Sequence, residues 1–80
     1  VVIPDGCFTM DSPVTGSVWK IQVQAGELLP VAATAMILEA MKMEVAVDAD
    51  EHFEVIEVLV AEGASVRAGQ ALVVVKAMVV

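Results

Sequence analysis

An internal repeat constrains the fold of this chain more than any other feature of its sequence. An offset of 37 residues places Gly63 on Gly26 and, without any gap, matches residue identities at five further positions. These pairs are Asp11 and Asp48, Val18 and Val55, Val23 and Val60, Ala40 and Ala77, and Met41 and Met78. A repeat of this length indicates one supersecondary unit whose apolar face is buried by its copy. We therefore expect two similar units related by an approximate two-fold axis.

The repeated unit has the pattern of β-structure. Val, Ile and Leu dominate short runs such as residues 55–60 and 72–75, and turns that contain Gly separate these runs. In residues 18–24 apolar and polar side chains alternate, but the alternation slips by one residue midway. Short strands at this spacing predict a small all-β sandwich or barrel.

Composition excludes several classes of function. Hydrophobic residues make up 59% of the 80 residues, yet the longest internal stretch without a charge, residues 28–38, is short and contains Pro30. A membrane-spanning helix needs about 20 apolar residues, so the membrane is not an expected partner. The net charge of −7 leaves no basic face for nucleic acid. The single cysteine, Cys7, forms no internal disulfide, which fits the cytoplasm best and the mitochondrial matrix as an alternative.

The segment around Lys42 joins the two units, at a place where a hairpin would have to form. Residues 39–44 are good helix formers and include no Gly, Asn, Asp or Pro. Local propensity alone therefore favours a helical turn or a continuous strand. A tight hairpin usually needs positive φ, which would cost Met and Lys about 1–3 kcal/mol per residue. A cost of that size at a hairpin tip would indicate function.

The segment 38–44, Leu-Glu-Ala-Met-Lys-Met-Glu, resembles the biotin attachment motif of biotin-dependent carboxylases. Residues 12–20 (Ser-Pro-Val-Thr-Gly-Ser-Val-Trp-Lys) and 66–72 (Val-Arg-Ala-Gly-Gln-Ala-Leu) resemble the opening and closing strands of the same family. The resemblance implies a flattened β-barrel (a barrel-sandwich hybrid) of two four-stranded antiparallel sheets, with the attachment lysine on a hairpin turn. On this basis the carrier domain is expected at 10–76, between an N-terminal linker or edge segment at 1–9 and a C-terminal tail at 77–80.

The same resemblance implies a carrier that is not catalytic alone. A biotin protein ligase would link biotin to Lys42, and the domain would then carry a carboxyl group from a biotin carboxylase site to a carboxyltransferase site. Both partner domains would belong to a multidomain ATP-dependent carboxylase, which is a ligase. The pattern at 12–20 most resembles the carriers of urea carboxylases, while carriers of acyl-CoA and pyruvate carboxylases remain alternatives.

The residues beside Lys42 form the rest of the expected attachment site, namely Glu39, Ala40, Met41, Met43 and Glu44. Methionine is unbranched and adaptable, so the two thioethers suit contact with several partner surfaces in turn. Strand alternation predicts both methionines on the face opposite Lys42, with one partly buried. Glu39 is expected to solvate the tip, and Glu44 either solvates it or marks the site for the ligase.

Other charged residues are assigned structural positions. Lys20 and Lys76 are expected to be exposed strand residues and not modification sites. Glu27 and Glu62, beside the turn glycines, are expected to be solvated loop residues.

Two positions depart from the family pattern. Phe53 and Ala32 stand where the family favours glycine, whereas their counterparts in the other half are Gly16 and Gly69. Glycine reaches backbone angles and close contacts that other residues do not. These departures bear on stability and loop geometry near residues 50–54, away from the lysine.

Three alternatives to a biotin carrier remain. A lipoyl carrier has the same kind of fold, but that family has Asp before the lysine and Ala after it, whereas both neighbours of Lys42 are methionines. An unmodified β-domain that serves as an interaction module is the second alternative. A freestanding enzyme is the third, although one Cys, one His and no Tyr supply little material for a catalytic site.

Overall fold

The computed structural model describes residues 5–78 of the chain. This part contains eight β-strands, and no helix in it is long and apolar enough to cross a membrane. The strands are β1 (Cys7–Asp11), β2 (Gly16–Ile21), β3 (Leu28–Leu29), β4 (Thr34–Ala40), β5 (Met43–Asp48), β6 (Phe53–Val58), β7 (Ser65–Val66) and β8 (Ala71–Ala77).

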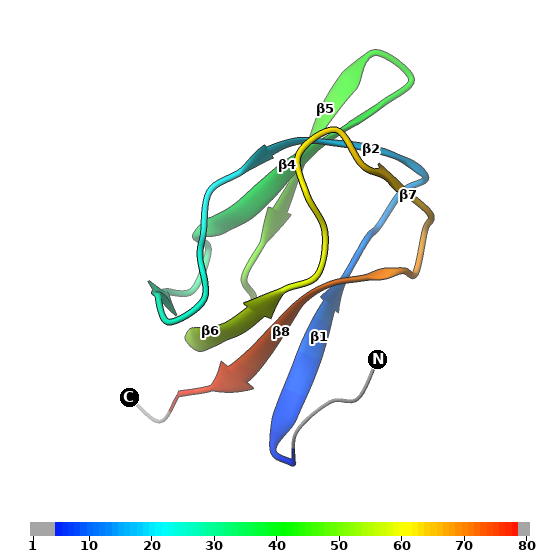
Figure 1. Ribbon diagram of the computed structural model, residues 1–80. Coiled ribbons are helices and arrows are strands. Elements are labelled where there is room, and N and C mark those ends of the chain that lie inside the picture. Colours follow the sequence, from blue (N-terminus) through cyan, green and yellow to red (C-terminus); the bar gives the residue numbers. More distant parts are fainter. Residues whose placement is uncertain (1–4, 79–80) are drawn as a thin grey trace.

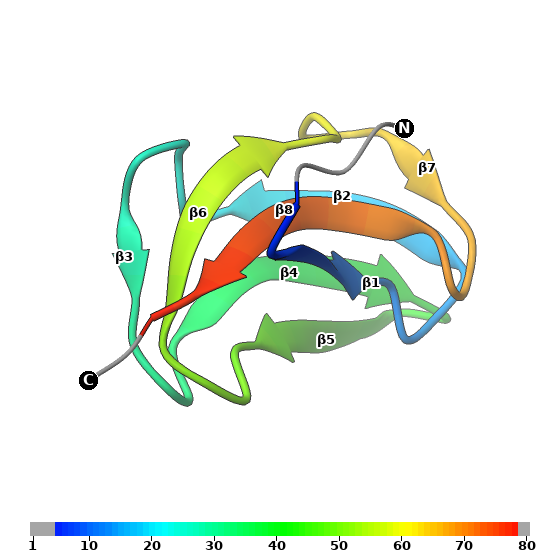
Figure 2. The same ribbon diagram turned by 90° about the horizontal axis from the view of Figure 1, so that it is seen from below.

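The strands form two four-stranded sheets that pack face to face (Figures 1 and 2). One sheet has the order β1-β8-β6-β3 and the other has the order β5-β4-β2-β7, with every pairing antiparallel. The two-residue strands β3 and β7 lie at opposite sides of the molecule in Figure 2. No strand pairing in residues 5–78 joins one sheet to the other. The all-β prediction with two four-stranded sheets is confirmed, and the fold is a flattened sandwich whose sheets do not close into a barrel.

The repeat seen in the sequence is a repeat of strands. Advancing by 37 residues carries β2 onto β6, β3 onto β7 and β4 onto β8, and it turns the strand order of one sheet into that of the other. The slip in the alternation of residues 18–24 is a β-bulge, because the β2–β4 register shifts between Val18 and Lys20. The β6–β8 register shifts between Val55 and Glu57, the counterparts of these two residues. Each unit therefore bends its central strand at the same place.

Backbone hydrogen bonds interlock the two units. The N–H of Gly26 in the first unit donates to the carbonyl of Val55 in the second, and the N–H of Gly63 in the second donates to the carbonyl of Val18 in the first, both at 2.7 Å. Both glycines have positive φ, near +90°, which glycine adopts without a steric cost. The glycine turn of each unit is therefore hydrogen-bonded to the central strand of the other unit.

The core fills the space between the sheets. Its side chains come from both units and are aliphatic residues, methionine and Phe53, and the largest fully buried ones include Val18, Met36, Leu38, Val55, Val66, Leu72, Val73 and Val75. Burial of each such side chain contributes about 1.5–3 kcal/mol. Because neither unit can bury its apolar side chains alone, the core forms only when the two units pack together.

The two departures from the family pattern have different structural consequences. Ala32 has φ +70°, the left-handed conformation that its counterpart Gly69 adopts at +87°, so the turn geometry is kept at a steric cost. Phe53 is buried at the start of β6, where it pairs with Leu29 of β3 and Ala77 of β8. Its backbone requires no glycine, and its ring adds to the core.

The described residues place both ends of the domain in one sheet. The edge strand β1 begins at Cys7, and its partner β8 continues to Ala77. Residues 1–4 and 79–80, which belong to the expected N-terminal segment and C-terminal tail, lie outside the described part. The boundaries given for the carrier domain stay a prediction.

Candidate attachment site at the β4–β5 hairpin

Lys42 lies in a two-residue turn that connects β4 to β5. Ala40 and Met43 pair across the strands and leave only Met41 and Lys42 between them. Both turn residues have positive φ, +51° and +64°, which is what a type I′ hairpin turn requires of its two central residues. The helical turn or continuous strand favoured by local propensity is therefore wrong. Pairing between strands of high β-propensity has overridden the preference of the turn residues.

The turn has a recognisable conformational cost. Type I′ turns are normally made by Asn-Gly or similar pairs, because these residues accept left-handed backbone angles. Met41 and Lys42 do not share that tolerance, and each left-handed residue costs about 1–3 kcal/mol. The hairpin holds this conformation because six register pairs between β4 and β5 fix both ends of the turn.

Lys42 is exposed at the end of a hairpin that projects from the body of the sandwich, at the top of Figure 1. The other two lysines lie within strands. Lys20 is an exposed residue of β2 whose Nζ lies 5.9 Å from the centre of the Trp19 ring, and Lys76 is an exposed residue of β8. Lys20 and Lys76 are therefore exposed strand residues, as expected, whereas Lys42 lies at a turn. That Lys20 and Lys76 are not modification sites stays a prediction.

Burial decreases along the inward-facing positions of β5 towards the tip. Val47 is buried, Val45 is half-buried and Met43 is 67% exposed. Met41, in the turn itself, is 95% exposed. The prediction that one of the two methionines would be partly buried is wrong, because the hairpin extends past the region where the opposite sheet covers it. Both thioethers that flank Lys42 are open to solvent.

The acidic residues of the motif lie opposite each other. Glu39 of β4 pairs in register with Glu44 of β5, and both are exposed, whereas the next pair towards the body begins with the fully buried Leu38. The two glutamates therefore occupy the outer face of the hairpin. Like charges directly opposite each other on a sheet are destabilising. Ala40 is half-buried between this pair and the turn.

Gly16 lies against the end of β4 next to the turn, a close approach that sequence reasoning did not assign to it. A Cβ at this position would collide with the carbonyl oxygen of Glu39 and lie 3.1 Å from the Cβ of Ala40. In the second unit the counterpart is Phe53, which pairs with Ala77 in the regular register. The contrast between glycine and phenylalanine at equivalent positions is the signal that could have identified the close approach.

Two glutamates expected to be solvated loop residues instead accept backbone hydrogen bonds. Glu62 Oε2 accepts from the N–H of Ile21 at 2.9 Å, which ties the β6–β7 loop to the end of β2. Glu27 Oε1 accepts from the N–H of Gln24 at 2.9 Å within its own turn. Both carboxylates remain on the surface, but they stabilise loop geometry that their sequence positions did not indicate.

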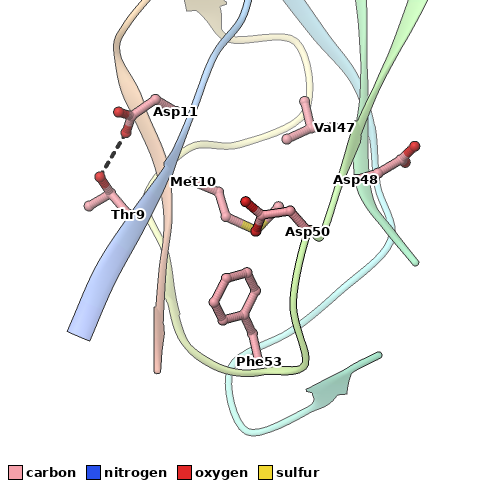
Figure 3. A pocket seen from close by; sticks show the side chains of 7 residues that line it. All are labelled: Thr9, Met10, Asp11, Val47, Asp48, Asp50 and Phe53. Carbon is pink, nitrogen blue, oxygen red and sulfur yellow. Dashed lines mark hydrogen bonds between the residues drawn. The ribbon is translucent and has the colours of Figure 1, made fainter. Parts of the chain in front are cut away.

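A pocket of about 270 Å³ lies away from the hairpin tip, between the ends of β1 and β5 (Figure 3). Met10, Val47 and Phe53 supply its apolar lining, and Thr9, Asp11, Asp48 and Asp50 line it as well. Thr9 donates to Asp11 at 2.7 Å, and Thr34 donates to Asp48 at 2.7 Å. Figure 3 shows the Thr9–Asp11 pair pointing away from Met10 and Phe53. We interpret this pocket as the open end of the core.

The fold and the hairpin together define a class of protein, a small domain of two interlocked β-units that presents one lysine at a strained and exposed turn. Comparison with known families identifies that class. Residues 8–75 match the biotin/lipoyl family described as "Biotin-requiring enzyme". The chain belongs to this family.

Relatives and solved structures agree with the family. A biotin/lipoyl attachment protein of Bacillus subtilis is 37% identical over 65 residues, which cover 81% of this chain and 89% of that protein. A putative urea carboxylase of Emericella nidulans is 37% identical over 70 residues, which cover 84% of this chain but only 6% of that protein. The chain therefore spans a small part of one relative and nearly the whole of the other.

Two solved structures contain the same fold. A single-chain, multi-domain long-chain acyl-CoA carboxylase superimposes with a TM-score of 0.91 at 28% identity, and the match covers 98% of this chain and 8% of that one. The urea carboxylase of Kluyveromyces lactis superimposes with a TM-score of 0.86 at 31% identity, covering 94% of this chain and 7% of that one. The predicted family resemblance is confirmed.

Proposed function

We propose that the chain is a biotin carboxyl carrier domain in which biotin is attached covalently to the side-chain amine of Lys42. The observation that carries the proposal is the two-residue turn, which holds Lys42 in a left-handed backbone conformation at an exposed tip. Strain of this kind is retained where the surrounding structure enforces it, and it is found at functional sites. Family membership supplies biotin as the group concerned.

The residues present fit a covalently attached biotin. Attachment needs a primary amine that an external enzyme can approach, and Lys42 is exposed in the turn between β4 and β5, where it takes part in no strand pairing among residues 5–78. Its deprotonated Nζ would attack the activated carboxyl group of biotin, so that an amide bond forms and the activating group leaves. Because the amine must lose a proton in this step, the ligase must recognise the hairpin and accept that proton. Exposed Met41 and Met43 offer apolar contacts for that recognition.

In carboxyl transfer the domain would act as a rigid support that presents the attachment lysine to partner active sites. Biotin, when attached, carries a carboxyl group on its ring. The β4–β5 hairpin, whose turn contains Lys42, projects from one end of the sandwich (Figure 1), so a partner active site could receive the tip without contacting the rest of the domain. Tethering of this kind replaces free diffusion by an effective concentration in the millimolar range at each partner site.

The partners follow from the same proposal. A biotin protein ligase would modify Lys42, and a biotin carboxylase domain and a carboxyltransferase domain would use the modified lysine in turn. The domain would break no bond itself and would act within an ATP-dependent carboxylase, a ligase. Similarity to the urea carboxylases of Emericella nidulans and Kluyveromyces lactis supports a urea carboxylase-like parent enzyme. The cytoplasm is the proposed compartment, with the mitochondrial matrix as the alternative.

Expression of the 80-residue chain together with a biotin ligase tests the attachment site. The intact mass is expected to increase by one biotinyl group, and peptide mapping is expected to place that group on Lys42. The Lys42→Arg variant keeps the positive charge but lacks the acyl acceptor, so it should gain no mass, while Lys20→Arg and Lys76→Arg serve as matched controls that are still modified. Biotin incorporation into the Lys42→Arg protein would disprove the assignment.

The same experiment separates biotin from lipoate. Biotinylated chain should be retained by streptavidin, whereas lipoylated chain should not. Methionines on both sides of Lys42, in place of the Asp and Ala of lipoyl carriers, favour biotin. Co-expression with a lipoate ligase should therefore leave the mass unchanged.

A further inference from the structure

The five methionines of the chain differ widely in the exposure of their side chains. Met10 and Met36 are buried, at 9% and 0% exposed, and belong to the core. Met41 and Met43 are 95% and 67% exposed, on either side of Lys42. Met78, the counterpart of Met41 in the repeat, is 37% exposed, less than Met41 and Met43, and follows β8 in the other unit. The two most accessible thioethers of the chain therefore flank the proposed attachment lysine.

Accessible thioethers are oxidised by peroxides. The sulfur lone pair attacks one peroxide oxygen, an S–O bond forms as the O–O bond breaks, and with hydrogen peroxide the other oxygen leaves as water. The thioether loses two electrons and becomes a sulfoxide, and the peroxide is reduced. The product is polar and chiral where the thioether was apolar, and methionine sulfoxide reductases reverse the change.

Oxidation at these two positions would alter the tip and leave the fold intact. Neither side chain belongs to the core cluster, so neither sulfoxide would have to enter the interior. An enzyme that acylates Lys42 must come close to Met41 and Met43, because they are its two neighbours in the turn and the adjoining strand. A surface of the acylating enzyme that binds two apolar, adaptable side chains would then contact two polar sulfoxide oxygens.

We propose that Met41 and Met43 form a peroxide-sensitive pair whose oxidation to sulfoxides suppresses acylation of Lys42. This inference rests on the proposed function for its consequence, but the selectivity of oxidation does not. The oxidant is a peroxide, and a sulfoxide reductase would restore the carrier.

The first test measures where oxygen is added. The full chain is treated with dilute hydrogen peroxide, the reaction is stopped with catalase, and peptide mapping follows the sulfoxide content of each methionine with time. We expect Met41 and Met43 to be oxidised at least about tenfold faster than Met36 and clearly faster than Met78. Far-ultraviolet circular dichroism should remain unchanged. Equal rates at Met41 and Met36 would overturn the proposal whether or not Lys42 is biotinylated.

The second test measures the consequence for the tip. The rate of Lys42 acylation by a biotin protein ligase, with biotin and ATP, is compared before oxidation, after it, and after repair with sulfoxide reductases. We expect oxidation to lower kcat/KM for the chain about fivefold or more, and repair to restore it. A chain oxidised at Met41 and Met43 but acylated at the original rate would contradict the proposal. Absence of acylation before oxidation would instead contradict the proposed function.

Substitution identifies the responsible sulfurs. Met41→Leu combined with Met43→Leu keeps the tip apolar without an oxidisable atom, and it should make acylation resistant to peroxide. Met78→Leu, at the equivalent position of the other unit, is the matched control and should stay sensitive. Loss of acylation by the same factor in the double-leucine protein would show that the sensitivity lies elsewhere. If that protein is a poor ligase substrate from the start, the repair experiment on the unsubstituted chain decides.

Discussion

Within residues 5–78, three non-glycine residues, Ala32, Met41 and Lys42, hold a left-handed backbone conformation. In this conformation the Cβ of an L-residue crowds a neighbouring carbonyl oxygen, which is the source of the conformational cost. At Lys42 and Met41 the cost accompanies the proposed attachment site. At Ala32 it does not, because this residue lies in the loop between β3 and β4, which is not part of the hairpin tip. Relieving the strain at Lys42 should therefore affect both stability and attachment, whereas relieving it at Ala32 should affect stability alone.

Glycine at position 32 should stabilise the domain. Ala32→Gly removes the steric cost but adds freedom to the unfolded chain, so we expect the free energy of unfolding to rise by about 0.5–1 kcal/mol. Gly69→Ala is the reciprocal variant, because a Cβ there would meet nothing within 4 Å and would add only strain. It should lower the free energy of unfolding by a similar amount. Urea denaturation of both proteins measures the difference, and a loss of stability in Ala32→Gly would refute the strain argument.

Lys42→Gly should be more stable and inactive as an acceptor. Glycine is the preferred second residue of a type I′ turn, so the free energy of unfolding is expected to increase by about 1 kcal/mol. Lys42→Arg keeps the Cβ and should leave stability unchanged. Both variants should remain without biotin in the presence of ligase. If Lys42→Gly unfolds at the same denaturant concentration as Lys42→Arg, the turn residue carries no strain.

At the scale of elements, the close approach of β4 to Gly16 sets the position of the hairpin. In Gly16→Ala the new Cβ would collide with the Glu39 carbonyl, and that strand would have to shift. Such overpacking costs about 1–3 kcal/mol, and we expect Lys42 acylation to fall as the hairpin is displaced. Gly63→Ala is the control, because its Cβ would meet nothing within 4 Å and adds only backbone strain.

Amide chemical shifts provide the measurement that separates the two variants. In Gly16→Ala the changes should concentrate in residues 39–44, whereas in Gly63→Ala they should stay around the β6–β7 loop. Equal acylation rates for Gly16→Ala and the unsubstituted chain would contradict the positioning role.

The elements differ in how far the sequence could predict them. The glycine turns and the β2 and β6 strands follow from patterns in the chain itself, including the bulges that appear as a slip in the alternation. The hairpin turn at Met41 and Lys42 could not be predicted from local preference, since its conformation is imposed by the pairing of β4 with β5. The exposure of Met43 escaped prediction for a related reason. Alternation gives the face of a strand, but not how far that strand extends beyond the opposite sheet.

At the scale of the whole molecule, the interlocking of the units predicts one cooperative unfolding transition. Gly26 bonds to Val55 and Gly63 bonds to Val18, so separating the units would break hydrogen bonds of both turns and expose both halves of the core. A domain of 80 residues has a stability of roughly 4–12 kcal/mol. We therefore expect neither unit to stay folded once the hydrogen bonds between the units and the shared core are lost.

Leu38 and Val75 occupy equivalent positions in the two units, and both are fully buried. Leu38→Ala should lower the free energy of unfolding by about 2–5 kcal/mol and Val75→Ala by about 2 kcal/mol, through lost burial and the cavities left behind. Trp19, the single tryptophan, reports on the first unit by fluorescence, while far-ultraviolet circular dichroism reports on all strands. If the units unfold together, both signals should move to the same lower denaturant midpoint in each variant, including Val75→Ala, whose cavity lies in the unit without the tryptophan. A Trp19 transition that keeps its midpoint in Val75→Ala while the dichroism transition shifts would show two units that fold independently.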